Sequence, residues 1–116
     1  IVDSIPIERA VSMGFRRNVV IATRNRGFRN TGKDRKIPRF IYKNYPRLRV
    51  ALSRRIALYN QQLDMLERME DSGEVLCIRP QRPMEVDRIE KDATKLERLY
   101  EEGYNLGDEF CRKGLL

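Results

Sequence analysis

Two short, continuous apolar runs constrain the fold of this chain more than any other feature of its sequence. Residues 19–22 form the first run, within NVVIATR, and EVLCIRP, residues 74–80, holds the second. Each run is bounded by charged residues or Pro, and this pattern predicts a strand buried on both faces, as in a parallel sheet. Two strands do not make a stable sheet by themselves. We therefore expect their neighbours to come from residues outside this sequence or from a partner chain.

A helix is expected directly before the first strand. Ser4 is its predicted N-cap, Pro6 lies in the first turn, where a missing N–H costs little, and Gly14 ends it. The expected buried side consists of Ile7, Ala10 and Val11. A helix that ends at Gly and leads into a buried strand is half of a βαβ unit, so the sequence predicts an α/β class.

The net charge of +7 is concentrated in residues 16–55, which carry 14 Lys and Arg against one acid, Asp34. Within this stretch, residues 24–37 are rich in Gly and Asn and are predicted to form a loop. Three interpretations stay open: a surface that binds anionic lipid, a nucleic-acid site, or a solvated surface balanced by acidic parts of the polypeptide outside this sequence. The candidate anionic-surface contacts are Arg24, Arg26, Arg29, Lys33, Arg35, Lys36 and Arg39, and the aromatic or aliphatic residues among the charges are Phe28, Phe40, Ile41 and Tyr45.

Helices are predicted for most of the remaining sequence. A short helix is expected over residues 38–45, and one long helix from Pro46 to about Asp71, ended by Gly73. Apolar residues recur along the long helix at steps of three and four and predict its buried stripe: Leu48, Leu52, Ile56, Tyr59, Leu63, Leu66 and Met69.

The last segment, residues 84–112, predicts one or two further helices. Their expected apolar side is Val86, Ile89, Ala93, Leu96 and Tyr100. Gly103 and Gly107, four residues apart, are expected to let another element approach closely.

The residue types exclude several classes of chemistry within this chain. Histidine is absent, which excludes a Ser-His-Asp triad, a Cys-His pair and an HExxH metal site. Cys77 and Cys111 lack zinc-ligand spacing, so both are expected to be free structural thiols. The tyrosines are expected to be packing residues, and no pair of carboxylates suggests acid–base catalysis. No metal and no cofactor are expected.

Residues 1–14, IVDSIPIERAVSMG, followed by NVVIATR, resemble the patatin-like phospholipases, which are serine acyl hydrolases of α/β type. In that family a strand that ends in D-G-G or D-G-A precedes a loop with a small polar residue and a Pro, then a helix that ends in Gly, then a hydrophobic strand. Ser4, Pro6, Gly14 and residues 19–23 match the last three pieces. The segments FIYKNYPRLRVALSRRIALYNQQLDMLERME and VLCIRPQ look like the C-terminal part of bacterial members.

The resemblance implies the C-terminal portion of a three-layer α/β/α fold, mostly helical with two short buried strands. Residues 1–80 would end the α/β domain, and residues 81–116 would form a C-terminal helical segment. It also implies a Ser-Asp dyad with a glycine-rich oxyanion loop. This sequence has no G-x-S-x-G and no D-G-G or D-G-A, and Asp3 lies in the loop before Pro6. Both catalytic residues are therefore expected upstream of Ile1, and none within this chain.

The expected function is that of a fragment of a patatin-like lipid acyl hydrolase that is inactive alone. Its expected partners are a phospholipid or other lipid ester, bound by the complete enzyme, an anionic membrane surface, and the N-terminal part of the same protein. The bacterial cytoplasm or the surface of the inner membrane is the expected compartment. The alternative is a small basic module that binds nucleic acid or a protein, and nucleic acid is the less favoured partner.

Overall fold

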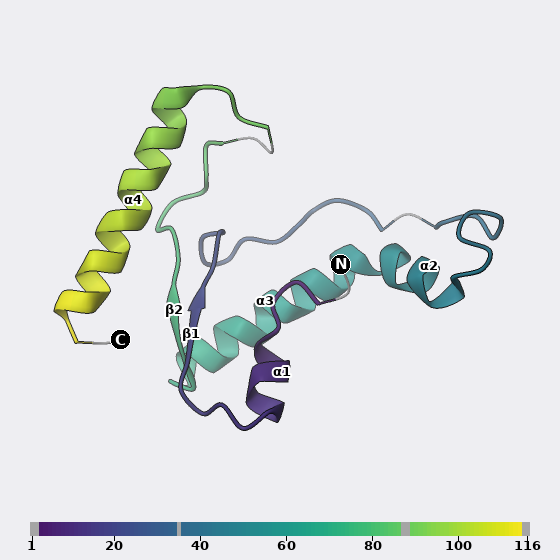
Figure 1. Cartoon of the computed structure of the whole chain (residues 1–116), viewed down its shortest axis with the longest axis horizontal. Coiled ribbons are helices and arrows are strands. Elements are labelled where there is room, and N and C mark those ends of the chain that lie inside the picture. The colour runs from purple at the N-terminus through teal and green to yellow at the C-terminus, as the bar shows by residue number, and fades with distance from the viewer. Residues whose placement is uncertain (1–2, 35, 87–88, 115–116) are drawn as a thin grey trace.

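The computed structural model describes residues 3–34, 36–86 and 89–114. Its elements follow the order α1 (Ile7–Ser12), β1 (Asn18–Ile21), α2 (Pro46–Ser53), α3 (Arg55–Asp71), β2 (Val75–Ile78) and α4 (Ala93–Arg112) (Figure 1). Four helices thus accompany two short strands in the part of the chain that is described. The described part of the chain is of mixed α and β type, as expected, and helix makes up most of its regular secondary structure.

The two strands form a parallel pair. Asn18 lies opposite Val75 and Ile21 opposite Ile78, and the Ala22 N–H extends the ladder to the Ile78 carbonyl at 2.8 Å. The connection between the strands begins with residues 22–45, which include the basic loop (residues 24–37), and continues through α2 and α3. It is the long crossover connection that a parallel pair needs. The parallel arrangement predicted from the apolar runs is confirmed. Within the described ranges, no third strand lies at either outer edge of the pair.

One small core joins α1, α3 and one face of the sheet. Leu66 of α3 is completely buried, and Ile7, Val75 and Cys77 are the other buried members of its cluster. Partly buried side chains pack around this cluster: Ile5, Val20, Ala22, Met65 and Met69. The predicted stripe of the long helix is therefore confirmed as core at its C-terminal half, where α3 lies beside the sheet.

The opposite face of the sheet is mostly uncovered. Because strand residues alternate between faces, Val19 and Ile21 point away from α3, and their exposed fractions are 49% and 78%. On the same face, Ile78 is buried beside α4, with a hollow of about 110 Å³ between Ile21, Ile78, Leu99 and Leu106. The prediction that the first strand is buried on both faces is wrong for this chain, since no described element covers β1 on this side.

The first helix is present but shorter than expected. Pro6, not Ser4, is its N-cap residue, and the Ser4 backbone N–H instead donates to Gln62 Oε1 at 3.2 Å. Gly14 follows the helix with a φ of +92°, a conformation that glycine adopts without strain. Ile7 is buried as predicted, but Val11 is exposed because no described element lies against that side of α1.

The long helix predicted over residues 46–71 is divided into α2 and α3. Arg54 interrupts it with φ −114° and ψ 9°. Asp34, from the basic loop, accepts hydrogen bonds from the Ile56 and Ala57 N–H groups at 2.8 and 3.1 Å, so a distant carboxylate caps the first turn of α3. Residues 39–44 form turns rather than the predicted short helix, and Tyr42 among them has a φ of 58°. Gly73 ends α3 as predicted, with a φ of 76°.

The C-terminal helix begins later than expected and turns a different side inward. Asp92 is its N-cap and accepts from the Thr94 N–H at 2.9 Å, so α4 does not include the described residues before it. The predicted apolar side is wrong, since Ile89, Leu96 and Tyr100 are exposed. Within the described residues, a Cβ at Gly103 or Gly107 of this helix would meet nothing within 4 Å. The two glycines leave room for another element, and no described element uses it.

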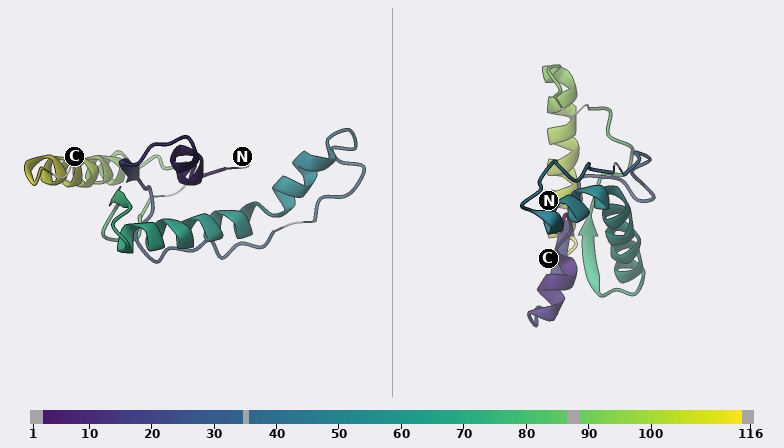
Figure 2. Two further views of the ribbon diagram at one scale, coloured as in Figure 1. Left: turned by 90° about the horizontal axis from the view of Figure 1, so that it is seen from below. Right: turned by 90° about the vertical axis from the view of Figure 1, so that its right-hand side faces the viewer.

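The chain is extended for its length. Its radius of gyration is 17.0 Å, whereas a compact domain of this length has about 13 Å. Its accessible surface is 9674 Å², whereas a compact monomer of this mass has about 6,600 Å². Figure 2 shows the cause: α2 and α4 lie at opposite ends of the molecule, with α1, α3 and the sheet between them. About 3,000 Å² of surface is thus exposed beyond what a compact fold of this size leaves in water.

Candidate functional site

Serines of the helices are not arranged as nucleophiles. The hydroxyls of Ser12 and Ser53 each donate to a carbonyl three residues earlier, at 2.8 and 2.9 Å. Ser72 Oγ lies within hydrogen-bond distance of the Met69 carbonyl, at 3.1 Å, and of Glu74 Oε1, at 2.7 Å. Such bonds are local and satisfy the last turn of a helix. Nothing among them has the strand-to-helix turn that exposes a nucleophilic serine.

The residues that the structure describes contain no group of His, Cys, Asp and Glu side chains arranged to hold a metal ion. The two cysteines are free thiols, as predicted. Cys77 is buried, and burial raises the pKa of its thiol. Arg79 Nε donates to Cys77 Sγ at 3.2 Å, which satisfies the sulfur within the core.

A cluster of ion pairs joins the basic loop, α3 and the end of β2. We call it the α3 ion-pair cluster, and its members are Arg26, Arg29, Arg79, Asp64, Glu67, Glu70 and Asp71. Arg26 Nη2 lies 2.7 Å from Asp71 Oδ1, and Arg29 Nη2 lies 2.9 Å from Glu67 Oε2. Both arginines come from the loop, so the cluster fixes the loop against the outer side of α3.

Glu67 lies at the centre of this cluster. It accepts hydrogen bonds from Arg29 and from the Gly27 backbone N–H at 2.9 Å, and Arg79 lies close to it. The Arg29 hydrogen bonds lower the pKa of Glu67 to about 2, and the same contacts raise the pKa of Arg29. The Arg79 side chain is only 8% exposed and the Glu67 side chain 17%, so both charges depend on their partners.

The predicted anionic-surface contacts therefore fall into separate groups. Arg26 and Arg29 are occupied by carboxylates of this same chain, so part of the basic charge is balanced internally and not by residues outside the sequence. Arg24 stacks its guanidinium carbon 4.7 Å from the centre of the Phe28 ring. Lys33 lines an open pocket of about 620 Å³ with Arg55 and Tyr59.

Of the remaining predicted contacts, Arg35 lies outside the described residues, while Lys36 and Arg39 are exposed. These two begin a stretch that we call the basic arm, residues 36–55. It carries seven cations and no acid: Lys36, Arg39, Lys43, Arg47, Arg49, Arg54 and Arg55. None of the seven forms an ion pair with another described residue.

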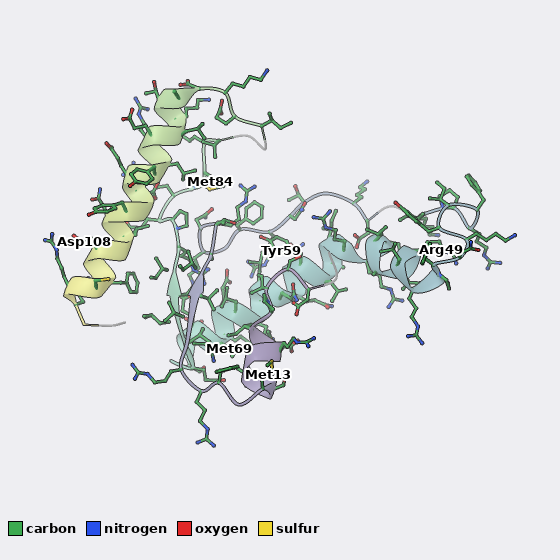
Figure 3. The ribbon with its side chains drawn as sticks, viewed as in Figure 1. Met13, Arg49, Tyr59, Met69, Met84 and Asp108 are labelled. Carbon is green, nitrogen blue, oxygen red and sulfur yellow. The ribbon has the colours of Figure 1, made fainter. Side chains whose placement is uncertain are left out.

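The basic arm also exposes large apolar side chains. Phe40 and Tyr45 are 79% and 65% exposed, and Ile41, Tyr42 and Val50 are exposed as well. Figure 3 places Arg49 at the end of the molecule that lies farthest from α4. In the described part of the chain, no helix is long and apolar enough to cross a lipid bilayer.

Sequence reasoning missed the α3 ion-pair cluster, although its signal was present. Asp64, Glu67 and Asp71 recur at steps of three and four, which places them on one side of a helix. Carboxylates on one side of a helix can form ion pairs with the arginines of a loop in the same chain. Their pairing neutralises Arg26 and Arg29 of the loop, whereas residues 36–55 contain no acid.

Residues 45–114 match the family described as "Domain of unknown function (DUF6363)". The chain belongs to this family. The DUF6363 match begins just before α2 and includes α3, β2 and α4, while α1, β1 and the basic loop lie outside it. No curated protein and no solved structure matches the chain. In this member, the only described strand that pairs with β2 thus comes from outside the matched segment.

Proposed function

We propose that this chain is the C-terminal part of a patatin-like lipid acyl hydrolase with a three-layer α/β/α fold. The nucleophilic Ser and the catalytic Asp would precede Ile1, so the chain is inactive alone. Its role would be to complete the sheet and to pack behind the strand that carries the active site. The observation that carries the proposal is the parallel strand pair: no described strand pairs with either outer edge, and no described element covers β1 on the face away from α3.

The exposure of β1 supports the proposal that the strand pair is part of a larger sheet. Parallel sheets occur almost only with both faces covered, and here Val19 and Ile21 of β1 are left exposed. The surface excess of about 3,000 Å² is in the range that obligate interfaces bury. Continuation of the sheet, with further helices on the bare face, would account for the composition of β1 and for the extended shape of the chain.

The local order of elements supports the resemblance. A loop that contains Ser4 and Pro6 leads into α1, Gly14 follows with positive φ, and β1 comes next. This is the order that patatin-like enzymes have after their catalytic Asp. The serines of the α1, α2 and α3 ends support the absence of a nucleophile from this part, since their hydroxyls bond to their own helices.

An esterase assay tests the proposal. The 116-residue chain and the complete product of its parent gene are compared on a chromogenic ester and on phospholipid vesicles. We expect no hydrolysis above buffer from the chain, and hydrolysis by the complete protein that disappears when the Ser of its G-x-S-x-G is changed to Ala. Serine-dependent turnover by the isolated chain would contradict the proposal. So would a parent gene without D-G-G or D-G-A directly before Ile1.

A second candidate is a small basic module that binds nucleic acid or a protein, and the unpaired cations of the basic arm favour it. A gel shift with duplex DNA in low and high salt distinguishes the two. Tight binding that falls steeply with salt, together with a start codon directly before Ile1, would favour this candidate over the hydrolase.

A further inference from the structure

Two arginines of the basic loop, Arg26 and Arg29, are not free to bind an external anion. Arg26 and Arg29 have short contacts with carboxylates of α3, and Asp34 caps the same helix. An anionic surface would have to displace these internal carboxylates before it reached the loop arginines. These two arginines and Asp34 therefore hold the loop against α3, and external binding would use cations other than Arg26 and Arg29.

The basic arm carries more unpaired cations than the loop. Its seven cations have no acid among them in sequence, and no described carboxylate lies within ion-pair distance of any of them. Each Lys or Arg held near an anionic bilayer strengthens binding about fivefold. Charge complementarity therefore favours binding of the arm to a ligand with many closely spaced negative groups.

Apolar side chains on the same arm favour a lipid surface as this negatively charged ligand. Phe40 is 79% exposed at the turn before α2, and Tyr45 and Val50 are exposed on or beside that helix. An apolar groove on α2, lined by Pro46, Val50 and Leu58, has a volume of about 430 Å³. A phosphate backbone makes no use of exposed aliphatic groups, whereas the boundary between head groups and acyl chains takes up cations and apolar groups together.

The position of the arm makes it accessible. Figure 1 shows α2 at one end of the molecule, beyond the N-terminal end of α3 and away from the sheet, and Figure 3 places Arg49 on this helix. The bare sheet face, which the proposed function assigns to the rest of the enzyme, lies elsewhere. Completion of the sheet would therefore leave the arm in solvent.

We propose that the basic arm, residues 36–55, is a membrane-contact element that binds the surface of an anionic lipid bilayer. This inference rests on the proposed function for its biological meaning, because a lipid acyl hydrolase must reach a lipid surface. Vesicle binding, however, requires neither the upstream residues nor catalysis. A chain that binds no vesicles would overturn the membrane-contact inference and leave the hydrolase proposal to its own assay.

Vesicle co-sedimentation with the whole chain tests the charge. Vesicles of phosphatidylcholine alone are compared with an equal mixture of phosphatidylcholine and phosphatidylglycerol, in low and high salt. The arm variant replaces three exposed cations that make no ion pair with a described residue, Arg39→Gln, Lys43→Gln and Arg47→Gln. Its control removes the same charge elsewhere, as Arg16→Gln, Arg17→Gln and Arg98→Gln. We expect the arm variant to lose about 100-fold in affinity for the anionic vesicles, and the control less than about fivefold.

Fluorescence tests where the chain touches the bilayer. The protein contains no tryptophan, so one introduced residue is the only indole and reports on its own position. We expect Phe40→Trp to shift its emission to the blue on anionic vesicles, as its side chain enters the interface. Tyr100→Trp on α4, which is also exposed, should stay unchanged. Both variants keep an aromatic ring, and circular dichroism confirms that they keep the fold.

Three results would overturn the inference. One is the absence of binding to anionic vesicles. Another is equal loss of affinity in the arm variant and its control, which would indicate net charge without a defined site. The third is tighter binding to duplex DNA than to vesicles, with that binding lost in the arm variant, which would assign the arm to nucleic acid.

Discussion

Among single residues, Glu67 most directly links the folded state to pH. Its pKa lies at about 2, below the ordinary 4.5, because Arg29 and the Gly27 N–H bond to its charged form. A carboxyl whose pKa is lower in the folded state stabilises that state above its unfolded pKa. The stabilisation is lost as the pH falls through the folded pKa. We therefore expect the free energy of unfolding, measured with urea, to decrease between about pH 5 and pH 2.

The variant Glu67→Gln tests this assignment. At neutral pH it removes a charged acceptor from Arg29 and should lower the free energy of unfolding by about 2 kcal/mol. It should also reduce the loss of stability in acid. Glu97→Gln is the matched control, since Glu97 is exposed on α4 and forms no ion pair with a described residue. Equal effects of the two substitutions would show that the α3 ion-pair cluster contributes little.

Leu66 is the only completely buried large side chain among the described residues, so it should dominate the stability of the small core. We expect Leu66→Ala to cost about 3 kcal/mol, because it removes apolar contacts from both α1 and the sheet and leaves a cavity. Leu96→Ala removes the same atoms from an exposed site on α4 and should cost less than about 1 kcal/mol. Thermal unfolding followed by circular dichroism compares them. A similar loss in both variants would mean that the core is not where the structure places it.

At the level of elements, the start of α3 depends on a residue more than twenty positions away. Asp34 supplies the acceptor that the Ile56 and Ala57 N–H groups lack within the helix. We expect Asp34→Ala to lower the free energy of unfolding by about 1 kcal/mol. It should also speed amide exchange at residues 56–57, while residues of the middle of α3 stay protected. Asp34→Asn keeps an acceptor and should recover part of the loss; no recovery would argue against capping.

The elements that the sequence predicted well are those fixed by local signals. Both strands lie where the apolar runs placed them, because β-branched and apolar residues bounded by charge or Pro favour only a short extended segment. Gly14 and Gly73 end their helices with positive φ, as glycine allows. These features depend on a few neighbouring residues, so the sequence alone suffices to place them.

The elements that the sequence misplaced depend on tertiary contacts. The break at Arg54 accompanies the cap from Asp34, which no local pattern around residue 54 reveals. On α4, apolar residues occupy a wide arc, and the pattern alone does not say that Leu99 and Leu106, rather than Leu96 and Tyr100, lie toward the sheet. The candidate site follows the same rule. Charge density predicted a basic surface, but the pairing of Arg26 and Arg29 with α3 became visible only in the fold.

At the scale of the whole molecule, about 3,000 Å² more surface is exposed than in a compact protein of this mass, so the fold buries less area than such a protein does. Among the described residues only Leu66 is fully buried, and many large apolar side chains, including Val19 and Ile21 of β1, are exposed, so the chain gains little from folding alone. If the proposed upstream part of the enzyme covers that face, much of the stability of this region belongs to the complete protein. The family match covers residues 45–114, so β2 lies inside it and its partner strand β1 lies before it.

Hydrogen exchange tests this dependence. In the isolated chain, each strand has a partner on one edge only, so we expect amides of β1 and β2 to exchange with low protection. In the complete product of the parent gene, neighbouring strands and helices should slow those amides at least about 100-fold, because their opening becomes linked to unfolding of a larger core.

Amides near Arg49 in the basic arm serve as the internal control and should exchange alike in both proteins, since the arm stays in solvent. Equal protection of the strands in both proteins would mean that the pair is complete as it stands. The sheet would then offer no support for a larger hydrolase.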